Sequence, residues 1–309
     1  MDFGGDGGIG VMAVDLKEMF VDFQKELDTK YESMTHAPLS QVRRVYVRGD
    51  VHGNFDWLKP FCEKENTTTN DVMILAGDSG LLFYGKNKTR EILLKKICSR
   101  APITLLVVRG NHDNRPANEG MTLRWNELVC GDCYWEDEYP NILYAKEIGR
   151  YWMRYKSFLT IGGAYSVDKF YRIRQHWTWY PDEELTDQEM VAGLEELAGE
   201  EFDYIISHTA PLDLEPTWLF MNSIDQTAVS KRMEKFLQRI KNCVNYRCWI
   251  WGHYHDDHQW PRLDPTTAPT IDDPAHIMLM NEIGILEEIN NPSHPSYLWK
   301  GEWKTVDLE

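Results

Sequence analysis

Several short apolar runs in this chain stop abruptly at a polar motif that contains glycine. The first three are Val42–Val47, Val72–Ala76 and Ile103–Val108, which are rich in β-branched and other apolar residues. A run of this length that ends at a glycine is typical of a strand buried on both sides. Helical stretches at Phe55–Lys64 and Thr89–Ser99 lie between the runs. Strands that alternate with helices predict a largely parallel sheet and an α/β fold.

The same pattern returns in the C-terminal half of the chain. Runs at Tyr204–Ile206 and Arg247–Trp251 each lead into a further polar motif. Between them, apolar residues at helical spacing predict an amphipathic helix, and these are Val229, Met233, Phe236, Leu237 and Ile240. Two later runs, His276–Asn281 and Ser296–Trp299, are predicted to be closing strands.

Residues 41–309 are predicted to form one domain, preceded by an N-terminal extension of residues 1–40. The extension carries apolar residues at steps of three and four, namely Leu16, Met19, Phe20, Phe23, Leu27 and Tyr31. We expect this amphipathic helix to pack on the main domain, with a homo-oligomer contact as the alternative. Residues 114–199 separate the third motif from the fourth and are interpreted as an insertion. Thr186 and Glu189 within it have the spacing of a helix capping box.

The charge of the chain limits its partners. A net charge of −16 argues against a broad basic face for long duplex nucleic acid. The sequence has no apolar run of about 18 residues, so we expect no membrane span. The first ten residues are rich in Gly and Asp, unlike a signal peptide, and we therefore expect a cytoplasmic protein.

The five polar motifs contain metal-ligating side chains at or just after the ends of the predicted strands. These are Asp50, His52, Asp78, Asn111, His208, His253 and His255. The carboxyl ends of parallel strands meet at one edge of a sheet, where ligands bind. Five of the ten histidines of the chain lie in these motifs, a concentration that chance does not explain. The sequence therefore predicts a metal site at the C-terminal ends of the strands.

The types of donor indicate which metals would bind. Carboxylate, imidazole and amide groups suit Mn²⁺, Fe²⁺ or Zn²⁺, and we expect Mn²⁺, with Fe, Zn, Ni and Mg as alternatives. Seven donors are too many for one tetrahedral ion but suffice for two if one carboxylate bridges them. Two cations about 3.5–4 Å apart can clamp a phosphate and polarise a shared water into hydroxide. A separate structural zinc site would need Cys130 and Cys133 to join Cys243 and Cys248, whose spacing fits poorly.

These motifs, which span residues 49–255, resemble the signature of the calcineurin-like metallophosphoesterase superfamily. They read Asp50-Val-His52, Gly77-Asp78-Ser79, Gly110-Asn-His-Asp113, a later His208, and Gly252-His-Tyr-His255. The resemblance implies a two-sheet β-sandwich flanked by helices (αββα), which is an α/β (α+β) fold. It further implies that Asp50, His52 and His255 hold one metal, that Asn111, His208 and His253 hold the other, and that Asp78 bridges them.

The resemblance also assigns roles around the metals. His112 would face the substrate and protonate the leaving oxygen, a task for which the pKa of histidine is suited. We expect Asp113 to orient the other ring nitrogen of His112 and Asn54 to contact a phosphate oxygen. The second motif lacks the additional Asp and Arg of the Ser/Thr phosphoprotein phosphatases, which argues against that branch of the superfamily.

An arginine that binds the substrate phosphate must then come from elsewhere in the chain or be absent. The segment Lys169–Trp179 interleaves Arg172 and Arg174 with aromatic residues, a combination that suits a nucleotide-like ligand. The alternative for this segment is a solvated surface hairpin.

The function predicted from these observations is hydrolysis of a small phosphodiester or nucleotide-like monoester at a dinuclear centre, with a bridging hydroxide as nucleophile. One alternative is a nuclease that acts on short or single-stranded nucleic acid. Another is a degenerate metal-binding scaffold without activity, against which the complete set of ligand positions argues.

Overall fold

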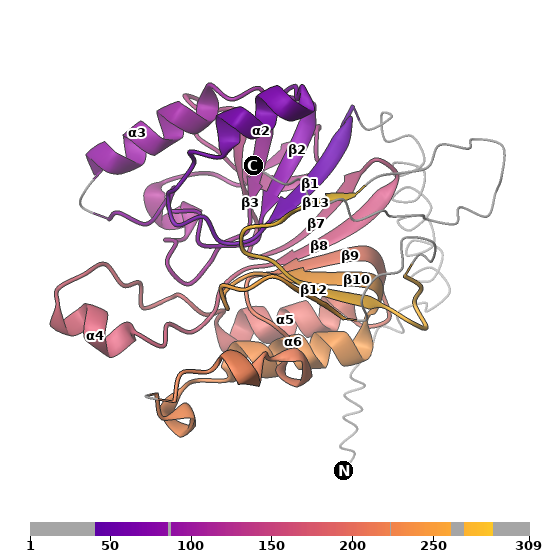
Figure 1. Cartoon of the computed structure of the whole chain (residues 1–309). Helices are drawn as coiled ribbons and strands as arrows, with labels where there is room; N and C mark the ends of the chain where they lie inside the picture. Colours follow the sequence, from indigo (N-terminus) through magenta and orange to yellow (C-terminus); the bar gives the residue numbers. More distant parts are fainter. Residues whose placement is uncertain (1–40, 86–87, 223, 261–268, 287–309) are drawn as a thin grey trace, which may run out of the picture. The chain divides into compact units, whose positions relative to one another are not determined.

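The computed structural model describes residues 41–85, 88–222, 224–260 and 269–286 (Figure 1). The amphipathic helix predicted in the extension and the strand predicted at Ser296–Trp299 lie outside these ranges.

Two mixed sheets form the centre of the fold. The first has seven strands in the order β13 (Ile283–Leu286), β1 (Arg44–Arg48), β2 (Asp71–Leu75), β3 (Thr104–Val107), β6 (Ile142–Ala145), β5 (Gly131–Tyr134) and β4 (Arg124–Asn126). The second has six in the order β11 (His258–Trp260), β12 (Ala275–Met278), β10 (Asn245–Trp251), β9 (Glu201–Ser207), β8 (Lys156–Ile161) and β7 (Ile148–Met153). In each sheet four neighbouring strands run parallel and the outer strands pair antiparallel.

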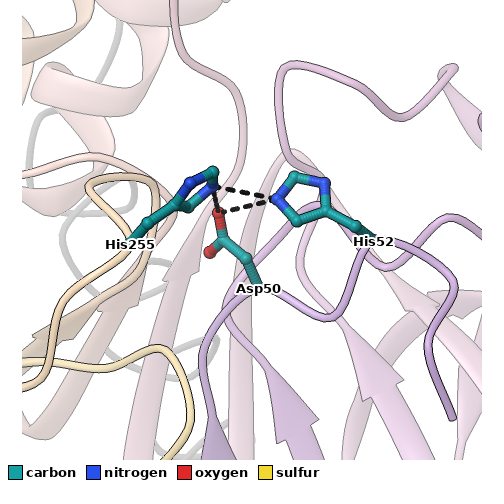
Figure 2. Close-up of side chains that lie close together, drawn as sticks. All are labelled: Asp50, His52 and His255. Carbon is teal, nitrogen blue, oxygen red and sulfur yellow. Dashed lines mark hydrogen bonds and ion pairs between the residues drawn. The ribbon is translucent and has the colours of Figure 1, made fainter.

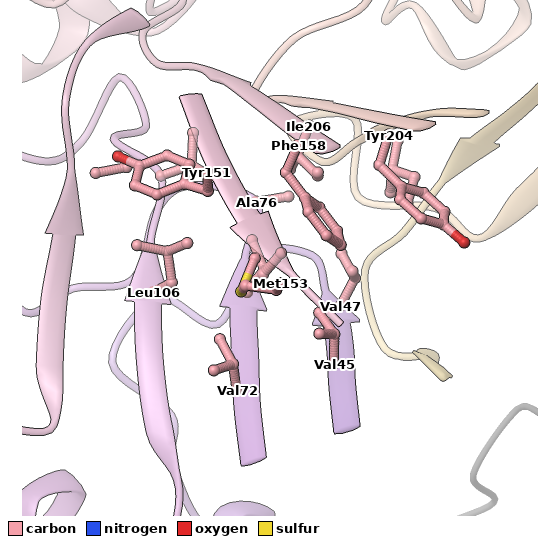
Figure 3. Close-up of a cluster of buried hydrophobic side chains, with 14 of the residues drawn as sticks. Val45, Val47, Val72, Ala76, Leu106, Tyr151, Met153, Phe158, Tyr204 and Ile206 are labelled. Atoms are coloured by element: carbon pink, nitrogen blue, oxygen red, sulfur yellow. The ribbon is translucent and has the colours of Figure 1, made fainter. Parts of the chain in front are cut away.

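The sheets pack face to face because their strands are apolar on both faces. Val45 and Val47 of β1 point into the core between the sheets, and Tyr46 between them points the other way. Figure 3 shows this inner core, where Phe158 and Tyr204 of the second sheet stack with ring centroids 4.9 Å apart. Because successive side chains point to opposite faces of a strand, each sheet has one apolar face for the core between the sheets and another for the helices.

Helices cover the two outer faces. α2 (Leu58–Glu65) and α3 (Lys88–Ser99) pack on the first sheet, and α5 (Asp187–Leu197) and α6 (Arg232–Cys243) pack on the second. The capping box predicted at α5 is confirmed, since Thr186 and Glu189 each bond the other's backbone N–H. No helix within the described ranges is long and apolar enough to cross a bilayer. The predicted αββα sandwich is confirmed.

The stretch 114–199 differs from a simple insertion, because it contributes β4 to β8 to both sheets. Most of these strands carry mixed polar and apolar residues; β7, for example, alternates half-buried with buried positions. That alternation is a weaker signal in the sequence than a continuous apolar run, and β11 and β13 are short. Sequence reasoning therefore missed β4 to β7, β11 and β13. The segment Lys169–Trp179 begins with a short helix, α4 (Lys169–Arg174), instead of a hairpin.

Candidate metal centre

The loops that follow β1, β2, β3, β9 and β10 bring the side chains of the five motifs together. Asp50, His52 and His255 form the first group, and one ligand atom from each lies within 4.8 Å of the others (Figure 2). The two histidine Nε2 atoms are 2.9 Å apart, and the Asp50 Oδ2 atom lies 3.2 Å from His255 and 3.7 Å from His52. Three donor atoms from two sheets therefore converge on one point.

The Asp50 carboxylate fits a metal ligand. It is 4 % exposed, and its Oδ1 atom accepts a hydrogen bond from the backbone N–H of His253. Its Oδ2 atom is buried and has no partner with hydrogen-bond geometry among the described residues. A buried carboxylate oxygen without a partner is costly, and a cation held with the two imidazoles would satisfy it.

Asp78, Asn111 and His208 form the second group, and each is almost fully buried. The Nδ1–H of His208 donates to the carbonyl of Ala76 at 2.8 Å, which points Nε2 at the Asn111 amide oxygen, also 2.8 Å away. Such a second bond fixes the tautomer and orientation of a metal-ligating histidine. Burial lowers the pKa of His208, but the Asp78 and Asp50 carboxylates outweigh it and raise the pKa to about 9, so a cation that binds His208 must displace the proton on Nε2.

His253 completes this group, with its ring centroid 4.9 Å from that of His208. Burial and then the charge of His208 lower its pKa to about 3, so its ring stays neutral. A neutral imidazole is the form that ligates a metal.

Asp78 of the second group also lies close to residues of the first. It shares a cluster with His52 and His112 and another with Asp50 and His208. Burial raises the pKa of Asp78, but His112 and His208 lower it further, so the net pKa lies well below the usual value. The carboxylate is therefore ionised, the form that ligates a cation.

The backbone of the site is strained at the candidate ligands. Nine described non-glycine residues have a positive φ, and four of them are His52, Asp78, His253 and His255. This conformation is uncommon outside glycine and gathers at functional sites. The strain thus marks the same loops as the motifs.

Two of the glycines that precede candidate ligands leave room for a ligand from another loop. A Cβ atom on Gly110 would lie 2.0 Å from Asp78 Oδ1, and one on Gly252 would lie 2.1 Å from Asp50 Oδ1. Each glycine therefore allows a carboxylate from a neighbouring loop to pack against the backbone.

We expect Gly110→Ala to lower metal affinity at least about tenfold, the lower end of what loss of an orienting contact costs, because the added methyl displaces Asp78. Metal titration checks this. Gly120→Ala is the control, since nothing lies within 4 Å of its Cβ position, although its φ of +80° adds local strain. Equal affinities in the two variants would contradict the packing argument.

His112 and Arg172 lie in contact with each other beside Asp78. His112 stacks on Phe83 with ring centroids 5.6 Å apart, and the Arg172 Nη2 atom lies 3.0 Å from both of its ring nitrogens. Arg172 is 7 % exposed and is held by the Asp168 carboxylate and the Thr178 carbonyl. Burial lowers the pKa of His112, the Asp78 carboxylate raises it, and the charge of Arg172 lowers it again. The net pKa lies below the ordinary value.

Other residues named from the sequence lie differently. Arg174 is exposed and makes no hydrogen bond or ion pair to the described residues. It lies two residues after Arg172 on α4, and side chains at that spacing point to different sides of a helix. The Asn54 side chain accepts from the Asp56 backbone and holds a local turn.

Asp113 accepts from the backbone of Ser79, Gly80 and Gly110 and makes no hydrogen bond with the His112 ring, in contrast to the expectation. Its position links the second motif to the third.

Sequence reasoning missed the support of Asn111. Its amide nitrogen donates to Ser166 Oγ at 2.8 Å, and Ser166 donates to Glu183, which also accepts from the Trp179 indole. Because that nitrogen is occupied, the amide oxygen faces His208. The Gly162-Gly163 turn before Ser166 is visible in the sequence, but its pairing with Asn111 is not.

Comparison with known proteins agrees with this geometry. The family model for calcineurin-like phosphoesterases matches residues 43–257. Among solved structures, TT1561 of Thermus thermophilus is similar at 14% identity and a TM-score of 0.44, covering 79% of this chain and 94% of that one. A structure described as a novel archaeal phosphodiesterase has 12% identity and a TM-score of 0.34, covering 79% and 93%. These structural likenesses are too weak to bear on activity, and no curated protein matches the chain.

Proposed function

The chain belongs to the calcineurin-like phosphoesterase family, and on that premise we propose that it hydrolyses small phosphodiesters or nucleotide-like monoesters at a centre of two divalent cations. It is a metal-dependent phosphoric ester hydrolase, and the proposal adds the number of metals and the substrate class. The observation that carries the proposal is the position of Asp78, a buried and ionised carboxylate shared by two clusters of donors.

In this proposal Asp50, His52 and His255 hold one cation. The other is held by Asn111, His208 and His253, and Asp78 contacts both. Mn²⁺ is the metal we favour, because carboxylate, imidazole and amide donors suit a borderline divalent cation. When bound, the pair of cations supplies positive charge for the phosphate oxygens and activates water as the nucleophile.

The remaining groups act on the substrate. Arg172 is placed to bind a phosphate oxygen, since its guanidinium is held rigidly beside His112. His112 protonates the leaving oxygen in this proposal. Its lowered pKa opposes that role in the free protein. A phosphate bound to Arg172 adds a negative charge beside His112, which offsets the charge of Arg172 and raises the pKa.

A hydrolysis screen with added Mn²⁺ tests the proposal. It compares a nitrophenyl monoester, a bis-nitrophenyl diester, cyclic nucleotides and single-stranded oligonucleotides. We expect turnover of the small esters that stops when a chelator is added and returns with Mn²⁺. Turnover confined to oligonucleotides would indicate a nuclease, and no turnover with any metal would favour a scaffold.

Arg172 and Arg174 provide a matched pair for substrate binding. We expect Arg172→Ala to raise KM about tenfold or more, the cost of a hydrogen bond to a charged group, while Arg174→Ala stays within about twofold. Steady-state kinetics on a small ester, with metal content measured in parallel, checks this. An equal effect of the two substitutions would remove Arg172 from the phosphate site.

A further inference from the structure

A cavity of about 130 Å³ lies beside the candidate metal centre. Its lining includes the metal-ligand candidate His253 and residues of the loop before α6, among them Phe220, Ile224 and Val229. Pockets for drug-sized ligands span roughly 300–1,000 Å³, so this one suits a single small ring system. Because it shares His253 with the centre, a group that fills it is next to the reacting phosphate.

The polar end of the cavity has an unused acceptor. Glu234 of α6 lines the cavity and is 4 % exposed. Its Oε1 atom accepts from the Thr209 hydroxyl at 2.9 Å, but its Oε2 atom has no hydrogen-bond partner among the residues that the structure describes. A buried carboxylate oxygen without a partner is an exception that needs an explanation, and a bound donor provides one.

Lys231 and Tyr254, two other polar residues of the cavity lining, are already paired. Lys231 forms an ion pair with Glu215, which also lines the cavity. The Tyr254 hydroxyl lies 3.0 Å from Thr209 Oγ1. Among the buried polar atoms of the lining that the structure describes, Glu234 Oε2 is therefore the acceptor without a partner.

Aromatic and aliphatic side chains make up much of the cavity lining. Phe220 and Tyr254 lie nearly parallel, at an interplanar angle of 21° with ring centroids 6.3 Å apart. Ile224 and Val229 add aliphatic surface. Aromatic and aliphatic walls of this kind suit a planar ring, which can stack on them.

We propose that this cavity binds a planar ring with an amino group, as in adenine, and that Glu234 accepts a hydrogen bond from the amino group. This inference rests on the proposed function, because it makes the ring part of the ester whose phosphate lies at the metal centre. The proposed function then becomes hydrolysis of esters of amino-bearing nucleosides.

Calorimetric titration with nucleosides tests the pocket without any hydrolysis. Adenosine is compared with purine riboside, which lacks only the amino group, on the Mn²⁺-loaded full chain. The titration is done at pH 8.5, because burial raises the pKa of Glu234 to about 7 and the carboxylate must be ionised. We expect adenosine to bind about tenfold tighter or more, the worth of a hydrogen bond to a charged group. Glu234→Met should reduce this ratio to about one.

Two further variants make the result specific. Glu195→Gln, an exposed residue of α5, should keep the wild-type ratio. Val229→Phe, which fills the cavity and leaves Glu234 in place, should abolish adenosine binding. Equal affinities for the two nucleosides, a ratio unchanged in Glu234→Met, or no saturable binding would each overturn the proposal. Hydrolysis of the bis-nitrophenyl diester reports separately on the proposed function, because that ester has no amino-bearing ring.

Discussion

Asp78→Asn is expected to reduce hydrolysis of every substrate more than any other single ligand substitution. Substitution of a residue that only supports a metal ligand lowers metal affinity or activity roughly 10–100-fold, and we expect the loss of activity in Asp78→Asn to exceed that range. The reason is that Asp78 faces both clusters of donors, and an amide lacks the negative charge that two cations share. Turnover of a nitrophenyl diester at saturating Mn²⁺ measures the effect.

Asp132→Asn is the control for this substitution, because Asp132 is an exposed carboxylate on β5. It should retain wild-type turnover. If Asp78→Asn also retained turnover close to wild type, with its metals bound, Asp78 would not be the shared ligand.

His112→Ala is expected to discriminate between substrates by their leaving groups. General acid catalysis contributes about 10²–10⁴-fold, so hydrolysis of an ester with an alkyl leaving group should fall by that amount. A nitrophenyl ester should be slowed much less, since nitrophenolate leaves without a proton. The ratio of kcat values for the two esters, in wild type and variant, is the measurement.

Metal content distinguishes this role from a ligand role. His112→Ala should bind as much Mn²⁺ as the wild type, because the backbone N–H of His112, which the substitution keeps, donates to Asp78 at 2.9 Å, whereas the ring Nε2 lies 3.9 Å from that carboxylate. Equal losses on both esters would show that His112 is not the acid.

Much of the centre could be predicted because each candidate ligand has a local signal. Asp50, Asn111 and His253 follow glycines that end apolar strands, and parallel strands bring their carboxyl ends together. The glycines carry part of this signal, since the Cβ positions of Gly110 and Gly252 are filled by ligands from other loops. The seven predicted donors therefore lie in adjoining clusters at one end of the strands.

Orientation within the insertion was harder to predict. Composition grouped Arg172 with Arg174, but only the helical geometry of α4 separates the buried guanidinium from the exposed one. Asp113 follows His112 in sequence, yet its carboxylate turns back to the N–H groups of the second motif. Short-range spacing gives the residue types, whereas the direction of each side chain depends on loops that meet only in the fold.

Long-range contacts had no signal in the sequence. The Ser166–Glu183 pair behind Asn111 joins residues 17 positions apart. Glu234 has the sequence context of a charged helix surface, and only the packing of Thr209 and Tyr254 against it shows that it is buried.

The bound metal itself tests the account most directly. After loading with Mn²⁺ and removal of free ion, elemental analysis should find two Mn²⁺ per wild-type chain. His255→Ala, which removes one donor of the first group only, should retain about one. Fewer than one ion per wild-type chain, or two ions retained in His255→Ala, would contradict a dinuclear centre at these residues.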